Sequence, residues 1–92
     1  MADHPALQTL RRVEQAYRAG SPRDAFALAE AAWDMVRDLG ANSPQVLGLA
    51  TSWYGFLKAR IDGDLRGGIK LVRDASEIAF WEPRIFFHLA DL

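Results

Sequence analysis

The placement of proline and glycine limits this chain to a set of short, separate segments. Breaks divide its 92 residues into five stretches, and they fall at Pro5, Gly20-Ser21-Pro22, 40–44, 62–64 and Glu82-Pro83. Twice a serine stands directly before a proline that opens a new stretch, at Ser21-Pro22 and at Ser43-Pro44. A serine side chain caps the free amides of a helix start, and proline at the first helical position gives up an amide that has no partner there. Both pairs therefore predict the start of a helix.

The apolar positions between these breaks recur with the period of a helix. No stretch shows sustained alternation with a period of two, and no Asn-Gly pair is present to form a tight hairpin turn. Gly20 and Gly40 stand where a left-handed C-terminal cap is expected. We therefore expect one all-α domain with about five helices, over residues 5–19, 22–39, 44–61, 65–80 and 84–91.

The third stretch is expected to be the central helix, because its polar face is the thinnest. Two stripes of small residues follow helical spacing on the second and third stretches; they are Ala25, Ala29 and Ala32, and Gly48, Ser52, Gly55 and Ala59. A glycine inside a helix costs about 1 kcal/mol relative to alanine. Close packing against a neighbouring helix would offset that cost, and a short bend in the third helix is the alternative.

Two segments of the chain repeat one pattern. Gly20-Ser-Pro-Arg-Asp-Ala-Phe and Gly63-Asp-Leu-Arg-Gly-Gly-Ile each place a glycine in the turn, a capping residue next, and a small residue five positions after the glycine. The second segment follows Trp53-Tyr54-Gly55-Phe56-Leu57, an aromatic stretch with leucine and glycine. This pattern resembles the tetratricopeptide repeat family, although the turn glycines are further apart than the roughly 34 residues of the standard repeat.

The resemblance implies stacked antiparallel helical hairpins, with one hairpin over 5–39, a second over 44–80, and a terminal helix over 84–91. A generic helical bundle is the alternative fold. In tetratricopeptide-like arrays the first helix of each hairpin lines a concave groove that binds an extended peptide or a partner helix. Carried over by position, this implies the partner-binding residues Glu14, Tyr17, Arg18, Trp53, Leu57 and Arg60. For Trp53 and Leu57, a plain core position is the alternative.

The last helix and the turn before it concentrate apolar side chains, which form a candidate association surface. Its residues are Trp81, Ile85, Phe86, Phe87 and Leu89. A patch of this kind left exposed favours association. Three arrangements are open: the segment folds onto the fourth helix, it docks on a second copy to form a homodimer, or the chain is a fragment of a longer array whose next helix covers it.

Residues for catalysis or metal binding are scarce. The chain has no cysteine and two histidines, His4 and His88. His4 precedes Pro5, where N-capping or disorder is expected. His88 shares a helical face with Arg84 and Asp91, which indicates a solvated stripe. Motifs of phosphate loops, zinc hydrolases and serine hydrolases are absent. We therefore expect no catalytic, cofactor-binding or metal-binding residues and no enzymatic activity.

Charge and hydropathy limit the kinds of partner. There are 11 Lys+Arg and 12 Asp+Glu, so the basic excess typical of nucleic-acid binders is missing. No basic signal segment opens the chain, and no apolar run approaches the roughly 18 residues that span a bilayer. The sequence favours a cytoplasmic, bacterial-type adaptor that binds another protein or peptide, with neither nucleic acid nor membrane as a partner. The alternative is a small secretion- or assembly-type chaperone that shields an apolar helix of its client.

Overall fold

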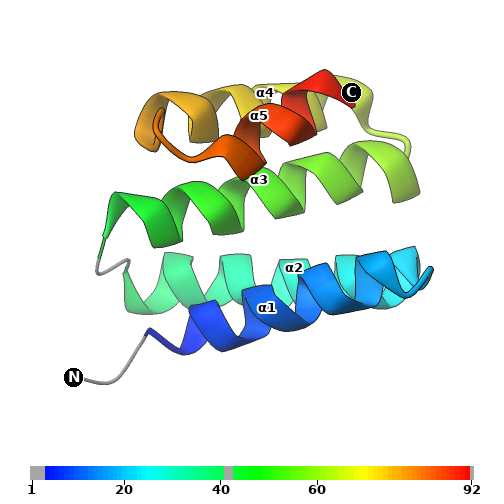
Figure 1. Cartoon of the computed structure of the whole chain (residues 1–92), viewed down its shortest axis with the longest axis horizontal. Coiled ribbons are helices and arrows are strands. Elements are labelled where there is room, and N and C mark those ends of the chain that lie inside the picture. The colour runs from blue at the N-terminus through cyan, green and yellow to red at the C-terminus, as the bar shows by residue number, and fades with distance from the viewer. Residues whose placement is uncertain (1–3, 41–42, 92) are drawn as a thin grey trace.

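A computed structural model describes residues 4–40 and 43–91, apart from the side chains of Leu39 and Phe86. Within these ranges the chain forms helices and no strand (Figure 1). The helices are α1 (Pro5–Arg18), α2 (Pro22–Leu39), α3 (Pro44–Ile61), α4 (Leu65–Ile78) and α5 (Pro83–Ala90). The prediction of an all-α fold with about five helices is confirmed, and the predicted bounds differ from these by a residue or two at some ends.

The turn after α1 ends the helix as the sequence predicts. The Ser21 N–H donates to the Ala16 carbonyl over 2.9 Å, and the Gly20 N–H donates to the Tyr17 carbonyl over 3.1 Å. These two bonds form a Schellman cap, which requires the left-handed conformation that Gly20 adopts at φ +82°. The turn reverses the chain, so that α2 runs back along α1 (Figure 1).

Ser43 and Ser21 behave differently at the starts of α3 and α2. Ser43 is extended, at φ −159° and ψ 155°, and its side chain accepts a hydrogen bond from the Val46 N–H over 3.3 Å. Ser21 has ψ 68° and makes no side-chain cap, so the prediction of a serine cap is confirmed at Ser43 and wrong at Ser21. The Ser21 backbone is not extended as that of Ser43 is, and its N–H already serves the Schellman cap of α1.

The helices stack in chain order as antiparallel neighbours, which confirms the predicted stack of hairpins. Helix α3 lies in the middle, with α1 and α2 on one side and α4 and α5 on the other (Figure 1). It contacts each of the other four helices, and its side chains Phe56 and Leu57 are fully buried. The thin polar face of this segment therefore predicted the central helix correctly.

Glycine allows α3 and α4 to approach closely. A Cβ atom at Gly55 would lie 2.6 Å from the Leu71 Cβ atom, and one at Gly68 would lie 2.5 Å from the Gly55 carbonyl oxygen. Both distances are far shorter than the 3.5–4.0 Å, roughly, at which carbon atoms pack. The small-residue stripe of α3 therefore serves close packing. On α2, the stripe of Ala25, Ala29 and Ala32 is completely buried.

Replacing Gly68 with alanine tests this close approach. The added Cβ atom would meet the Gly55 carbonyl oxygen at 2.5 Å. We therefore expect Gly68→Ala to lower the free energy of unfolding by about 1–3 kcal/mol, the usual cost of overpacking, although alanine favours a helix by about 1 kcal/mol over glycine. Urea unfolding followed by circular dichroism measures the change.

Gly67→Ala is the matched control for this substitution. Its Cβ atom would meet the movable Asp64 carboxylate, which caps α4 by accepting from the Gly67 N–H over 3.0 Å. Moving that carboxylate costs at most the stabilisation that the N-cap hydrogen bond provides, about 1 kcal/mol. A Gly68→Ala protein that is as stable as the wild type would contradict the close approach of the two helices.

Candidate functional site

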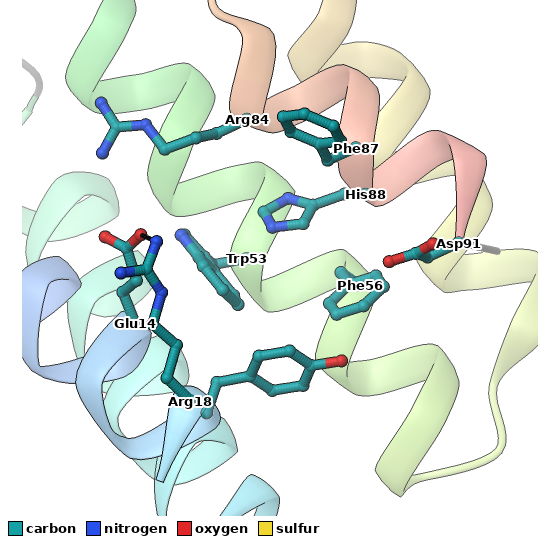
Figure 2. A pocket seen from close by; sticks show the side chains of 9 residues that line it. Glu14, Arg18, Trp53, Phe56, Arg84, Phe87, His88 and Asp91 are labelled. Atoms are coloured by element: carbon teal, nitrogen blue, oxygen red, sulfur yellow. Dashed lines mark ion pairs between the residues drawn. The ribbon is translucent and has the colours of Figure 1, made fainter. Parts of the chain in front are cut away.

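A cavity of about 260 Å³ lies between α1, α3 and α5. Figure 2 shows these helices around it, with Glu14 and Arg18 projecting from α1 and His88 from α5. Each helix contributes to the lining, which consists of Glu14, Tyr17, Arg18, Trp53, Phe56, Arg84, Phe87, His88 and Asp91. Glu14, Tyr17, Arg18 and Trp53, which the sequence analysis assigned to a groove, therefore lie around one cavity.

The other two residues assigned to the groove, Leu57 and Arg60, lie in an adjoining depression that also includes Tyr17. Leu57 is completely buried, so it belongs to the core. Arg60 is exposed, and its guanidinium carbon lies 4.8 Å from the centroid of the Phe56 ring. Its Nη2 atom donates to the Asp91 main-chain carbonyl over 3.0 Å. Arg60 therefore ties the end of α5 to α3.

Aromatic rings form the floor of the cavity. The Trp53 ring lies edge-on to Tyr17 at a centroid separation of 5.7 Å and edge-on to His88 at 4.3 Å. His88 in turn stacks on Phe56 at 4.7 Å, with an interplanar angle of 19°. Trp53 is 6% exposed, so most of its surface is used in such contacts. Because these rings hold one another in place, the floor of the cavity is a packed aromatic layer.

Charged side chains of both signs border the cavity. The Arg18 Nη2 atom lies 2.8 Å from a Glu14 carboxylate oxygen. The Arg84 Nε atom donates to Glu82 over 2.9 Å, and Glu82 also accepts from the Gln45 amide over 3.0 Å. Hydrogen bonds from Arg84 hold the pKa of the Glu82 carboxyl below its usual value. Since Gln45 belongs to α3, Glu82 fixes both Arg84 and the start of α5 against α3.

His88 is buried, so the prediction of a solvated stripe at this position is wrong. It is 5% exposed, and its Nδ1 atom lies 2.5 Å from the hydroxyl oxygen of Ser52 on α3. Burial lowers the pKa of His88 to about 4, with a further contribution from the positive charge of Arg84. The imidazole is therefore neutral at physiological pH. His88 does share a face with Arg84 and Asp91, which are exposed, but the His88 ring itself lies in the cavity wall.

His4 has a structural role at the start of α1. Its Nδ1 atom accepts a hydrogen bond from the Ala6 N–H over 3.1 Å, which confirms the N-capping alternative. Its Nε2 atom donates to the Gly40 carbonyl over 2.7 Å. His4 therefore joins the start of α1 to the end of α2, and it takes no part in lining the cavity.

The apolar residues of α5 divide between the core and the cavity. Ile85 is completely buried, and Leu89 packs half-buried against the core, because α5 folds onto α3 and α4. Phe87 is 69% exposed and lines the cavity. The side chain of Phe86, which the sequence analysis assigned to the same surface, lies outside the described residues.

Two further rings are exposed in the turn between α4 and α5. Phe80 is 69% exposed and Trp81 is 52% exposed. The two rings lie edge-on to each other with their centroids 5.2 Å apart. Neither ring lines the cavity, so this pair is a second and separate apolar surface.

Comparison of the chain with protein-family models, with curated proteins and with solved structures found no match. Among residues 4–40 and 43–91, no cluster of three or more histidine and acidic side chains could hold a metal ion. In the same ranges, no helix has the length and apolar character needed to cross a membrane.

Acid is expected to destabilise the protein through His88. Its pKa is about 4 in the folded state against 6.5 for a free imidazole, so the unfolded chain takes up a proton that the folded state does not. The resulting stabilisation is fully present above pH 6.5 and is lost as the pH falls towards 4. We expect the free energy of unfolding to fall by an amount on the order of 3 kcal/mol over this window.

The double variant Ser52→Ala/His88→Phe is the control for this effect, because it keeps a ring against Phe56 and removes the titrating group. Urea unfolding at a series of pH values measures both proteins. The wild type should lose more stability than the variant over the window in which His88 titrates. Parallel curves for the two proteins would contradict the assignment of acid sensitivity to His88.

Proposed function

We propose that this chain is a protein-interaction module that binds a peptide segment of another protein along α1, α3 and α5. The observation that carries the proposal is that one cavity with an aromatic floor draws its lining from these three helices and from neither α2 nor α4. Alternate helices line the binding groove in the tetratricopeptide-like arrays that the sequence resembles. The resemblance and the cavity therefore both support an adaptor of this type.

The shape of this side of the molecule favours an elongated ligand. Three depressions follow one another along α3 over residues 45–61. The first and second share Glu14, Trp53 and Arg84, and the second and third share Tyr17, so the three adjoin and we propose that they act as one groove. The groove follows α3 for about 24 Å at the helical rise of about 1.5 Å per residue. An extended peptide of about seven residues spans that length.

The groove offers an apolar surface at its centre and cations beside it. Phe87 is 69% exposed next to the aromatic floor, so an apolar side chain of the ligand would cover it. Arg18, with 78% of its side chain exposed, and Arg60 can pair with acidic side chains of the same ligand. This combination fits a peptide in which an apolar anchor residue is flanked by acidic ones.

Selection of peptides from a random display library on the immobilised chain tests the proposal without knowledge of the natural partner. The selected peptides should share an apolar anchor residue. Isothermal titration calorimetry then gives their affinity for the wild type and for a matched pair of variants, Phe87→Ala and Phe80→Ala. Both rings are 69% exposed, so neither substitution removes a core contact.

The two variants should differ sharply in affinity for the selected peptides. Phe87→Ala removes part of the groove, and we expect about a tenfold loss, equivalent to about 1.4 kcal/mol. Phe80→Ala leaves the groove intact, and its affinity should match that of the wild type. Equal losses in both variants, or no loss in Phe87→Ala, would contradict peptide binding in this groove.

A second candidate function is a small secretion- or assembly-type chaperone, and the exposed pair Phe80 and Trp81 favours it. An apolar pair in a turn can cover an apolar helix of a client or a second copy of the chain. Sedimentation velocity tests whether this turn is an association surface. The adaptor is expected to be a monomer whose mass is unchanged in Trp81→Ser, whereas a dimer that Trp81→Ser dissociates would favour association through this turn.

A further inference from the structure

His88 is a buried side chain with one ring nitrogen left for a ligand. The ring is 5% exposed, and Ser52 occupies its Nδ1 atom. Within the described ranges, the Nε2 atom makes no hydrogen bond to the chain. Every fully buried side-chain nitrogen or oxygen in these ranges has a hydrogen-bond partner, so the Nε2 atom is not fully buried. The Nε2 atom is therefore reached from the cavity that His88 lines. Figure 2 shows the ring projecting from α5 into the space between Trp53 and Phe87.

The hydroxyl of Ser52 determines which nitrogen carries the proton. The neighbouring Thr51 donates its hydroxyl proton to the Leu47 carbonyl over 2.7 Å. Ser52 is completely buried, and in the part of the chain that the structure describes its one hydrogen bond is to His88. If the Ser52 oxygen accepted a hydrogen bond from a proton on Nδ1, the Ser52 hydroxyl proton would be buried without an acceptor, at a cost of about 1–3 kcal/mol. Ser52 therefore donates to Nδ1, and the neutral imidazole carries its proton on Nε2.

The charges around the cavity favour an uncharged acceptor for this Nε2–H. Arg18 and Arg84 bring two positive charges to the lining, and Glu14 and Asp91 bring two negative ones, so the lining has no net charge. Both guanidinium groups already have a carboxylate partner, because Arg18 pairs with Glu14 and Arg84 pairs with Glu82, so an anion at the Nε2 atom would have to compete with one of these ion pairs. A main-chain carbonyl oxygen accepts the same hydrogen bond without carrying a charge out of water.

We propose that His88 fixes the main chain of the bound peptide. Its Nε2–H donates to the carbonyl oxygen of the ligand residue whose apolar side chain lies against Trp53 and Phe87. This inference rests on the proposed function, because the acceptor belongs to the peptide. At the central position of the groove, one residue of the peptide therefore contributes both an apolar side chain and its main-chain carbonyl.

The first measurement concerns the free protein. A long-range proton–nitrogen correlation spectrum at neutral pH should show the His88 ring protonated on Nε2. On binding of a peptide selected from the display library, the Nε2–H proton resonance should move downfield, as expected for a new hydrogen bond. A ring protonated on Nδ1 overturns the inference, because its Nε2 atom would then be an acceptor.

The second measurement locates the acceptor on the peptide. Each amide of the selected peptide is replaced in turn by an ester, whose carbonyl is a weaker acceptor. One replacement, beside the apolar anchor residue, should lower the affinity for the wild type about fivefold and leave the affinity for Ser52→Ala/His88→Phe unchanged. The other replacements are the controls, and circular dichroism checks the fold of the variant. In the wild type alone, the same ester should return the His88 Nε2–H resonance towards its position in the free protein.

The outcomes separate this inference from the proposed function. If the sensitive ester has the same effect in the wild type and in the variant, or fails to move the Nε2–H resonance, His88 is not the donor, although the peptide groove stands. If affinity depends on a free carboxylate of the peptide and on none of its amides, the acceptor is an anion and the inference is wrong. If no library peptide binds the groove, the proposed function and the inference fail together.

Discussion

The close contact of α3 with α4 and α5 determines the shape of the cavity between α1, α3 and α5. A Cβ atom at Gly55 would lie 2.6 Å from Leu71 of α4, so α4 lies directly along α3. Further along the same stripe, a Cβ atom at Gly48 would lie 2.7 Å from the Ala79 Cβ atom and 3.2 Å from the Ile85 Cδ1 atom. One stripe of small residues therefore positions both α4 and α5. Because the cavity takes part of its lining from α5, its shape depends on this packing.

Ser52 connects this packing to the chemistry of the groove. It lies between Gly48 and Gly55 on the same stripe, where a small side chain is needed, and its hydroxyl hydrogen-bonds to His88. The bond orients a ring that stacks on Phe56 and meets Trp53 edge-on. Burial keeps the pKa of that ring low and the ring neutral, which avoids the large cost of an unpaired buried charge. A polar group is thus held in an otherwise aromatic floor.

Local signals in the sequence predict the helices and the central position of α3, because serine, proline and glycine act on the backbone within one turn. The orientation of α5 is not predictable in the same way. Pro83–Ala90 is too short for its apolar period to separate Ile85, which is buried, from Phe87, which is exposed. The spacing of Arg84, His88 and Asp91 along the helix is the same whether this face lines a cavity or an open surface, so it does not predict the burial of His88. Only the position of α5 against α3 distinguishes the two.

We propose that α1, α3 and α5 together form a binding groove. The test of this groove is to map the amide chemical-shift changes that a selected peptide causes in the nitrogen-15-labelled protein. The groove predicts changes centred on Tyr17, Trp53 and Phe87, one from each helix, with the outer faces of α2 and α4 unaffected. Changes centred on α2, on α4, or on the turn at Phe80 and Trp81 would contradict it.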